Sequence, residues 1–282
     1  MTIKPRRSVL YMPGSNTRAL EKAKTLDADC FIFDLEDAVA PDAKADARQQ
    51  VCDAVAGGGY GKRELVIRIN SLASEWGKDD LAAAFKAKPD ALLVPKVNTP
   101  DDLAALSGID IPLWAMMETP LAMFNAKDIA FAPGIEAFVM GTNDLAKETG
   151  ASLERGRHAM VPWLMTCVAA ARAAGIAIID GVYNDFKNDD GLRTEALQGA
   201  DFGMDGKTII HPGQIAACNE IFAPSKDEIE TAQSIINAFS LPENQGKGAI
   251  NLNGRMVELL HCDIAKKTIA IAGAIKEKQE SP

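Results

Sequence analysis

Acidic side chains follow several of the short apolar segments in this 282-residue sequence. Glu118 comes directly after the run 113–117, where packing poorly explains a carboxylate, and Asp144 comes shortly after the run 137–141. Asp144 alone would be an ordinary helix N-cap, but its position one apolar segment after Glu118 favours a functional role for both. Carboxylates that crowd in a cleft repel one another, and a divalent cation relieves the cost of burying them. Because no cysteine or histidine cluster accompanies them, Mg²⁺ or Mn²⁺ is favoured over Zn²⁺.

Further polar residues stand at the ends of other apolar segments. Arg68 lies inside an apolar run and is either an ion-pair partner or, as we interpret it, a substrate clamp. Glu36 and Asp37 follow another run, where they are either helix caps or residues that hold metal-bound waters. A structural role is favoured for Asp34, and also for His211, because a proline follows it.

Eight short apolar runs alternate with alanine-rich segments, a pattern typical of parallel strands that helices cover on both faces. Eight repeats over about 220 residues predict an α/β fold, the (β/α)₈ or TIM barrel. An open, doubly wound sheet is the alternative, and the absence of a GxGxxG turn after any run argues against it. The predicted strands are Arg7–Met12, Cys30–Leu35, Leu65–Asn70, Ala91–Val97, Leu113–Glu118, Ala137–Gly141, Ala177–Asp180 and Thr208–His211.

The predicted barrel fold indicates where the polar residues lie relative to one another. Active sites of such barrels lie at the C-terminal ends of the strands, so residues that follow the runs should meet on one rim. We expect the carboxylates at these strand ends to converge there, and they are Asp34, Glu36, Asp37, Glu118, Asp144 and Asp180.

The pattern changes after the eighth run. We predict a catalytic barrel over residues 1–224 and a C-terminal helical extension over residues 225–282, with helices at Lys226–Phe239 and Met256–Ile275. Ser225 and Glu228 form a capping-box pattern at the start of the first. The extension is expected either to pack on or over a neighbouring subunit or to add a helix to its own barrel.

The composition bounds the function. The 47% hydrophobic content supports one large core, and no run of 18 apolar residues predicts a membrane span. The net charge of −9 argues against nucleic acid as a partner, although a small anion needs only a local basic patch. The five scattered cysteines and the lack of a signal-peptide pattern predict a cytoplasmic protein with reduced thiols.

At this point the motifs resemble a known family. The chain is similar to the citrate lyase β-subunit-like branch of the HpcH/HpaI aldolase superfamily, which includes malyl-CoA and citramalyl-CoA lyases. The resemblance covers nearly the whole chain and depends on eight short motifs in the correct order. They are Arg7–Gly14, Asp34–Val39, Val66–Asn70, Pro95-Lys96, Glu118–Pro120, Gly141–Leu145, Asp180–Tyr183 and Gly206–Pro212.

The resemblance implies roles for individual residues. Glu118 and Asp144 correspond to the two direct Mg²⁺ ligands, and Arg68 to the residue that binds substrate and stabilises a thioester enolate. The residues that correspond to coenzyme A contacts or to backbone-lined substrate positions are Tyr11, Asn16, Lys22, Asn143, Asp144, Ile209 and Ile210. Malyl-CoA lyases carry an arginine at the position of Asn16. Arg18, or Arg6 and Arg7, are further candidates to pair with the coenzyme A phosphates.

The segment Gly254–Glu258 resembles an arm that offers a catalytic aspartate to the neighbouring subunit, and here that residue is Glu258. The implied reaction is the reversible Mg²⁺-dependent cleavage of a 3-hydroxyacyl-CoA into an acyl-CoA and a 2-oxo acid, in a homo-oligomer of trimer or hexamer type. The alternatives are a malyl-CoA thioesterase on the same site, a class II aldolase that acts on free 2-oxo acids, and a non-catalytic coenzyme A-binding subunit of citrate lyase. We expect Asn70, Met117 and Tyr183 to set the size of the pocket.

Overall fold

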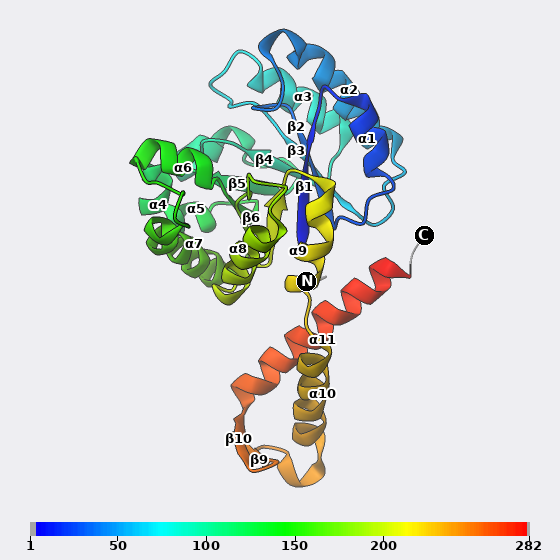
Figure 1. Cartoon of the computed structure of the whole chain (residues 1–282), viewed down its shortest axis with the longest axis vertical. Coiled ribbons are helices and arrows are strands. Elements are labelled where there is room, and N and C mark those ends of the chain that lie inside the picture. Colours follow the sequence, from blue (N-terminus) through cyan, green and yellow to red (C-terminus); the bar gives the residue numbers. More distant parts are fainter. Residues whose placement is uncertain (1–3, 281–282) are drawn as a thin grey trace. The chain divides into compact units, whose positions relative to one another are not determined.

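The computed structural model describes residues 4–280, and its strands close into a parallel barrel (Figure 1). The strands pair in sequence order, and each is followed by helical structure, which confirms the predicted TIM barrel and excludes the open sheet. Every predicted strand begins within two residues of the observed one. The strands are β1 (Ser8–Pro13), β2 (Cys30–Asp34), β3 (Glu64–Arg68), β4 (Ala91–Val94), β5 (Leu113–Met117), β6 (Ile135–Met140), β7 (Ala177–Asp180) and β8 (Gly206–Ile209).

Helices surround the barrel, and two of their ends show clear capping residues. Thr99 forms a reciprocal capping box with Asp102, and Gly175 ends a helix at a φ of 73°. The segment after Thr99 is a 3₁₀-helix, η2 (Pro100–Leu106). The other helical elements are α1 (Thr17–Ala23), η1 (Pro41–Ala43), α2 (Lys44–Gly57), α3 (Gly77–Ala87), α4 (Pro120–Phe124), α5 (Ala126–Ala130), α6 (Thr142–Thr149), η3 (His158–Met160), α7 (Val161–Ala174), α8 (Asp189–Asp201), η4 (Pro212–Gln214) and α9 (Ile215–Ile221).

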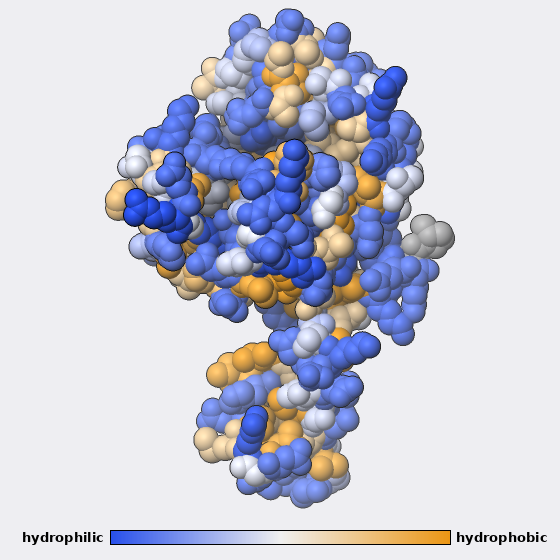
Figure 2. All heavy atoms as spheres, in the orientation of Figure 1, coloured by the Kyte–Doolittle hydropathy of each residue, from blue (hydrophilic) through white to orange (hydrophobic). Residues whose placement is uncertain are grey.

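The barrel core collects alternate residues of strands β1 to β7, because successive side chains of a strand point to opposite faces. Trp114 and Ile32 are fully buried in this cluster, and Tyr11 packs against it. Hydrophilic residues cover most of the visible face of the barrel (Figure 2). As expected, the five cysteines carry free thiols. Within residues 4–280, no helix is long and apolar enough to span a membrane.

A buried ion-pair network fastens β7 and β8 to the helix outside them. Asp180 accepts hydrogen bonds from Arg157 at 2.5 Å and from Lys207 at 2.8 Å, and Lys207 also contacts Glu195 of α8 at 2.7 Å. Burial alone would raise the pKa of Asp180, but the two cations outweigh burial and hold that pKa below its ordinary value. The expectation that Asp180 joins the other carboxylates at the rim is therefore wrong, because both of its oxygens are committed to this network.

The described residues from Phe222 onward, with Lys4 and Pro5, form a compact unit separate from residues 6–221. In it, α10 (Lys226–Ser240) packs against α11 (Leu259–Gln279), and the predicted capping box of Ser225 and Glu228 is present. A short 3₁₀ turn, η5 (Pro242–Asn244), follows α10.

The predicted helix Met256–Ile275 is wrong at its start. Met256 lies in the strand β10 (Arg255–Glu258), which pairs antiparallel with β9 (Ala249–Leu252). The turn between the strands is Asn253-Gly254, with φ angles of 52° and 83°. An Asn-Gly turn of this conformation strongly favours a β-hairpin. The residues from Met256 to Glu258 therefore continue the second strand, and the helix begins only at Leu259.

The network around Asp180 yields a stability prediction. Replacing Asp180 with alanine should cost on the order of 3–5 kcal/mol, because it leaves two buried cations without their shared carboxylate. Urea denaturation followed by circular dichroism measures this loss. As a control, Arg193→Ala removes the exposed pairs with Asp189 and Glu220 and should change stability far less, because water screens these charges. Equal losses in both variants would contradict the structural role of the network.

Candidate active site

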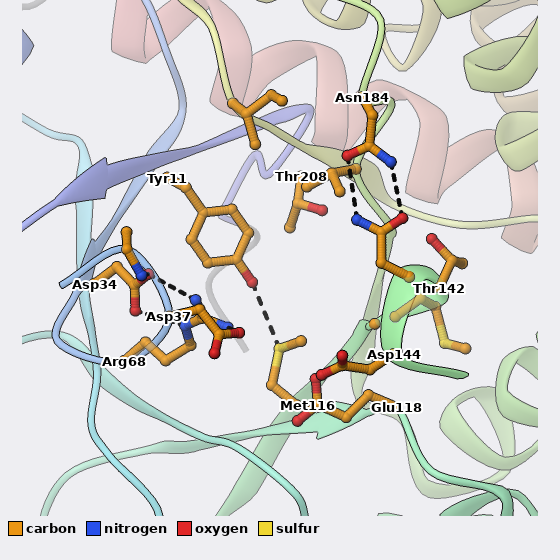
Figure 3. A pocket seen from close by; sticks show the side chains of 16 residues that line it. Tyr11, Asp34, Asp37, Arg68, Met116, Glu118, Thr142, Asp144, Asn184 and Thr208 are labelled. Carbon is orange, nitrogen blue, oxygen red and sulfur yellow. Dashed lines mark hydrogen bonds and ion pairs between the residues drawn. The ribbon is translucent and has the colours of Figure 1, made fainter. Parts of the chain in front are cut away.

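A cavity of about 320 Å³ lies at the C-terminal ends of the barrel strands. Its walls come from residues on both sides of the rim, and Figure 3 shows acidic, amide and sulfur-containing side chains that point into it. This volume suits a small ligand or the reactive end of a larger one. The lining residues are Tyr11, Asp34, Asp37, Ala38, Arg68, Met116, Glu118, Met140, Gly141, Thr142, Asn143, Asp144, Val182, Asn184, Thr208 and Ile210.

Glu118 and Asp144 meet at a single cation. The Lys96 ammonium donates a hydrogen bond to Asp144 Oδ2 and lies 3.6 Å from Glu118 Oε1. Both carboxylates are visible on the same wall of the pocket in Figure 3. The structure therefore brings the two predicted metal ligands close enough to share one positive charge.

Glu118 is fixed by its neighbours. Its Oε1 accepts a hydrogen bond of 2.8 Å from the Lys96 backbone N–H, and its side chain lies against Gly141. A Cβ at position 141 would lie 2.3 Å from Glu118 Cβ and 2.8 Å from Oε2, so this close approach requires glycine. Burial raises the pKa of Glu118, and Lys96 only partly opposes that effect. A further cation would therefore stabilise the charged form of Glu118.

Arg68 lies on another part of the pocket wall, held by the carboxylates of β2 and the loop that follows it. Its Nε and Nη2 donate to the two oxygens of Asp34 at 2.7 and 2.6 Å, and its guanidinium lies 5.0 Å from the centre of the Tyr11 ring. Asp34 also accepts from the backbone N–H groups of Glu36 and Ala38. Asp34 therefore has the structural role that the sequence favoured, and it orients Arg68.

Glu36 and Asp37 surround the remaining guanidinium nitrogen. Arg68 Nη1 lies 2.8 Å from Glu36 Oε2 and 3.5 Å from Asp37 Oδ2. Glu36 Oε2 is buried and has no aligned hydrogen-bond donor in the described structure. Burial raises the pKa of Glu36 to about 8, although Arg68 opposes the shift. Both carboxyl groups therefore contact Arg68.

The first turn of α6 forms another part of the pocket wall. Thr142, Asn143 and Asp144 open this helix, and the first N–H groups of a helix have no acceptor within it. The Asn143 side chain forms a reciprocal amide pair with Asn184, with distances of 3.1 and 2.8 Å. This pair joins the first turn of α6 to the segment that follows β7.

Tyr11, Asn16 and Lys22, which are predicted to contact coenzyme A, lie on or next to β1 and α1 and not on the elements that carry Glu118 and Asp144. Tyr11 lines the cavity and donates to Met116 Sδ at 3.5 Å, while burial raises the pKa of its hydroxyl above the ordinary value. Asn16 is the N-cap of α1 and accepts from the Ala19 N–H at 3.1 Å. Lys22 is exposed in the last turn of the same helix.

Two proposed phosphate partners are excluded by their burial. Arg6 is paired with Glu64 at 2.7 Å, and Arg7 is paired with Asp29 at 2.8 Å. Both arginines are less than a tenth exposed. Expecting them to bind phosphate was therefore wrong, since each is neutralised inside the barrel.

Ile209, Ile210 and Glu258 occupy different environments. Ile209 is fully buried in β8, whereas Ile210 lines the cavity and its N–H donates to Gln214 at 3.0 Å. Glu258 is not among the residues that line this cavity. It is the exposed N-cap residue of α11, and its backbone N–H donates to His261 Nδ1 at 3.0 Å.

The sequence interpretation missed part of the pocket wall. Asn70, Met117 and Tyr183 are not among the residues that line the cavity. Met116 lines it in place of Met117, and Val182 and Asn184 line it on either side of Tyr183. Since alternate residues of a strand face opposite sides, a shift of one position was enough to choose the wrong methionine. Lys96 was noted only as part of the motif Pro95-Lys96, without a role of its own. Lys96 follows an apolar run, just as Glu118 does, and this position could have identified it as a residue of the site.

The donor set fits a divalent cation of the Mg²⁺ type. Two carboxylates that already share a cation match the one or two protein ligands that Mg²⁺ commonly takes. Across residues 4–280 no cluster of three or more acidic, cysteine or histidine side chains could bind a metal alone. Substrate and water oxygens would therefore supply the other ligands.

A TIM barrel with a polar cavity at the C-terminal ends of its strands is the architecture of a barrel enzyme. The sequence matches the family described as HpcH/HpaI aldolase/citrate lyase over residues 7–212 and the one described as C-C bond lyase of the TIM-barrel fold over residues 156–274. The chain belongs to the HpcH/HpaI aldolase/citrate lyase family, and the predicted resemblance is confirmed.

Individual relatives cover almost the whole chain. A (3S)-malyl-CoA thioesterase of Cereibacter sphaeroides is 50% identical over 96% of this chain and 96% of its own length. A mitochondrial citramalyl-CoA lyase of Homo sapiens is 32% identical over 97% of this chain and 87% of its own length. The crystal structure of CitE from Mycobacterium tuberculosis, in complex with magnesium, acetoacetate and coenzyme A, is 27% identical. It superposes with a TM-score of 0.78 over 95% of this chain and 98% of its own.

The raised pKa of Glu36 yields a pH prediction. Between the ordinary pKa of 4.5 and about 8, the folded protein holds a proton on Glu36 that the unfolded chain has lost, so this contribution to stability disappears as the pH rises through about 8. Glutamine cannot ionise, and Glu36→Gln should therefore gain melting temperature relative to the wild type between about pH 5 and about pH 8.

Thermal melting of both proteins across that range measures this gain. Asp37→Asn, which removes an exposed carboxylate beside the same arginine, controls for the loss of one negative charge. A constant difference between the wild type and Glu36→Gln at all pH values would show that burial does not shift Glu36.

Proposed function

We propose that this chain is a Mg²⁺-dependent enzyme acting on a malyl-CoA-type thioester, with hydrolysis to the free hydroxy acid and coenzyme A as its principal reaction. The observation that carries the proposal is the pocket, in which paired carboxylates and an anchored arginine occupy one cavity. The 50% identity to a (3S)-malyl-CoA thioesterase supports hydrolysis over carbon–carbon cleavage.

In this proposal the substrate is divided between two parts of the pocket. Glu118 and Asp144 would hold the divalent cation, which supplies Lewis-acid polarisation of the substrate's oxygens when bound. The N–H groups in the first turn of α6 lie beside that site and favour the carboxylate end of the substrate. Mn²⁺ satisfies the same oxygen donors and is the alternative metal.

Arg68 would act at the thioester carbonyl. Attack of water on that carbon places negative charge on its oxygen, and a preoriented guanidinium stabilises such charge. Asp34 fixes the orientation of Arg68 through two hydrogen bonds, which lowers the cost of reorganisation during the reaction. The carbon–sulfur bond then breaks, and coenzyme A leaves as a thiol after accepting a proton.

The coenzyme A portion would extend along β1 and α1. Tyr11 at the cavity wall, Asn16 at the helix start and the exposed Lys22 follow one another along that edge. Lys22 and Arg18 are the cations on α1 that remain as candidates for the phosphates. Because the protein carries a net charge of −9, this attraction must be local and should weaken with added salt.

Carbon–carbon cleavage is the second candidate, supported by the family and by the 32% identity to citramalyl-CoA lyase. It yields an acyl-CoA and a 2-oxo acid, with Arg68 stabilising the thioester enolate and Glu258 as the proposed base. Glu258 would be supplied by the arm of a neighbouring subunit. This arrangement requires a homo-oligomer, for which we propose a trimer or hexamer.

Product analysis separates the two reactions. The purified protein is incubated with malyl-, citramalyl- or citryl-CoA and Mg²⁺, and the products are identified by mass spectrometry. For malyl-CoA, hydrolysis gives malate and free coenzyme A, whereas cleavage gives acetyl-CoA and glyoxylate. Acetyl-CoA and glyoxylate as the main products would reverse the proposed order. No conversion of any of these thioesters would reject both.

We predict that Glu118→Ala and Asp144→Ala each lower kcat on the order of a thousandfold or more, because each removes a proposed metal ligand. Release of free thiol from malyl-CoA at saturating Mg²⁺ measures the loss. As a control, Asp128→Ala removes an exposed carboxylate on α5 and should leave the rate unchanged. Near wild-type rates in both site variants would exclude the metal assignment.

A change at Glu258 should discriminate between the reactions. Glu258→Gln removes the proposed base and should slow any cleavage about 100-fold or more, while coenzyme A binding is retained. Exchange of the acetyl-CoA methyl protons with deuterated water, followed by NMR, reports on this base directly. Unchanged exchange in the variant would exclude Glu258 from that role.

A further inference from the structure

Lys96 occupies an unusual backbone position at the end of β4. Its φ of 53° lies in the left-handed region, which residues with a Cβ rarely adopt. In this conformation its backbone N–H donates to the buried Glu118 Oε1 at 2.8 Å. The backbone of Lys96 is thus anchored on the same carboxylate that its side chain approaches.

The Lys96 ammonium lies where the two carboxylates converge. It donates to Asp144 Oδ2 and lies 3.6 Å from Glu118 Oε1. A divalent cation bound to these oxygens would need contacts of about 2.0–2.1 Å and would repel an ammonium so close by. The ammonium and the cation therefore cannot both keep these contacts.

We propose that Lys96 is an internal competitor for the divalent cation, pairing with Asp144 and Glu118 and releasing Asp144 when the cation binds. This inference rests on the proposed metal site. The Lys96 side chain is 36% exposed, so the ammonium can move into water without becoming a buried charge. The hydrogen bond from its backbone to Glu118 does not depend on the side chain and can persist. Lys96 thus keeps two repelling carboxylates together while lowering their affinity for metal.

The test is isothermal titration of Mg²⁺ into the full-length protein and two variants. Lys96→Met keeps the length of the apolar stem but removes the competing charge, and it should bind Mg²⁺ on the order of tenfold more tightly. Lys147→Met is the matched control, because it removes an exposed lysine from α6, the helix that carries Asp144. The control should bind Mg²⁺ within about twofold of the wild type, because its charge is screened by water.

Melting temperatures give a second readout. Without Mg²⁺, Lys96→Met should melt below the wild type, because the buried Glu118 loses its counter-ion. Added Mg²⁺ should then raise its melting temperature more than that of the wild type. A purely structural lysine would give the opposite affinity change, because its loss would disorder the ligands and weaken binding.

The outcomes separate this inference from the proposed function. If Lys96→Met binds Mg²⁺ as tightly as the wild type or more weakly, the competition is overturned. If the wild type binds Mg²⁺ and Asp144→Asn does not, the proposed metal site still stands. If neither the wild type nor Lys96→Met binds Mg²⁺, both the metal site and the competition fail. If only Lys96→Met binds it, the competition is supported in its strongest form.

Discussion

Two buried or partly buried carboxylates that must share one cation impose the central constraint on this molecule. Strands β5 and β6 pair so that Met117 lies opposite Met140, which brings Glu118 beside Gly141 at the next level of the barrel. Only a residue without a Cβ tolerates that approach. The helix that begins directly after Gly141 then carries Asp144 to the same cation. Register, glycine and helix start therefore act together to form the site.

Around Arg68 the charges are reversed, because here one buried cation is held by surrounding carboxyl groups. A guanidinium buried to this degree needs partners, and Asp34 provides two oxygens in the fork geometry that suits an arginine. Glu36 and Asp37 place further carboxyl oxygens near Nη1, at 2.8 and 3.5 Å. The pocket thus places a pair of carboxylates and an anchored guanidinium on different walls. The two proposed reactions, hydrolysis and carbon–carbon cleavage, would both use these features and would differ in what attacks or leaves the substrate.

Most of the fold was predictable because its signals are local. Eight apolar runs with the composition of covered parallel strands gave every strand within two residues of its observed start. The hairpin of β9 and β10 was missed although Asn253-Gly254 is a turn signal, because the apolar spacing after Met256 also fits a helix. Asp180 was placed at the rim because it is the last residue of β7. Nothing in the sequence reveals that Lys207 and Arg157, which are distant in the chain, neutralise it on the outer side of that strand.

By itself the sequence determined which residue types end each strand, and thereby where acidic and basic side chains gather in a barrel. It could not determine which of them face one another, because ion pairs form between elements far apart in the chain and depend on register and on the direction of each side chain. The folded structure alone reveals that Asp34 pairs with Arg68. It also reveals that Arg6 and Arg7 are buried in ion pairs with Glu64 and Asp29. It also decided that Lys96 lies between Glu118 and Asp144, since that contact joins three separate strand ends.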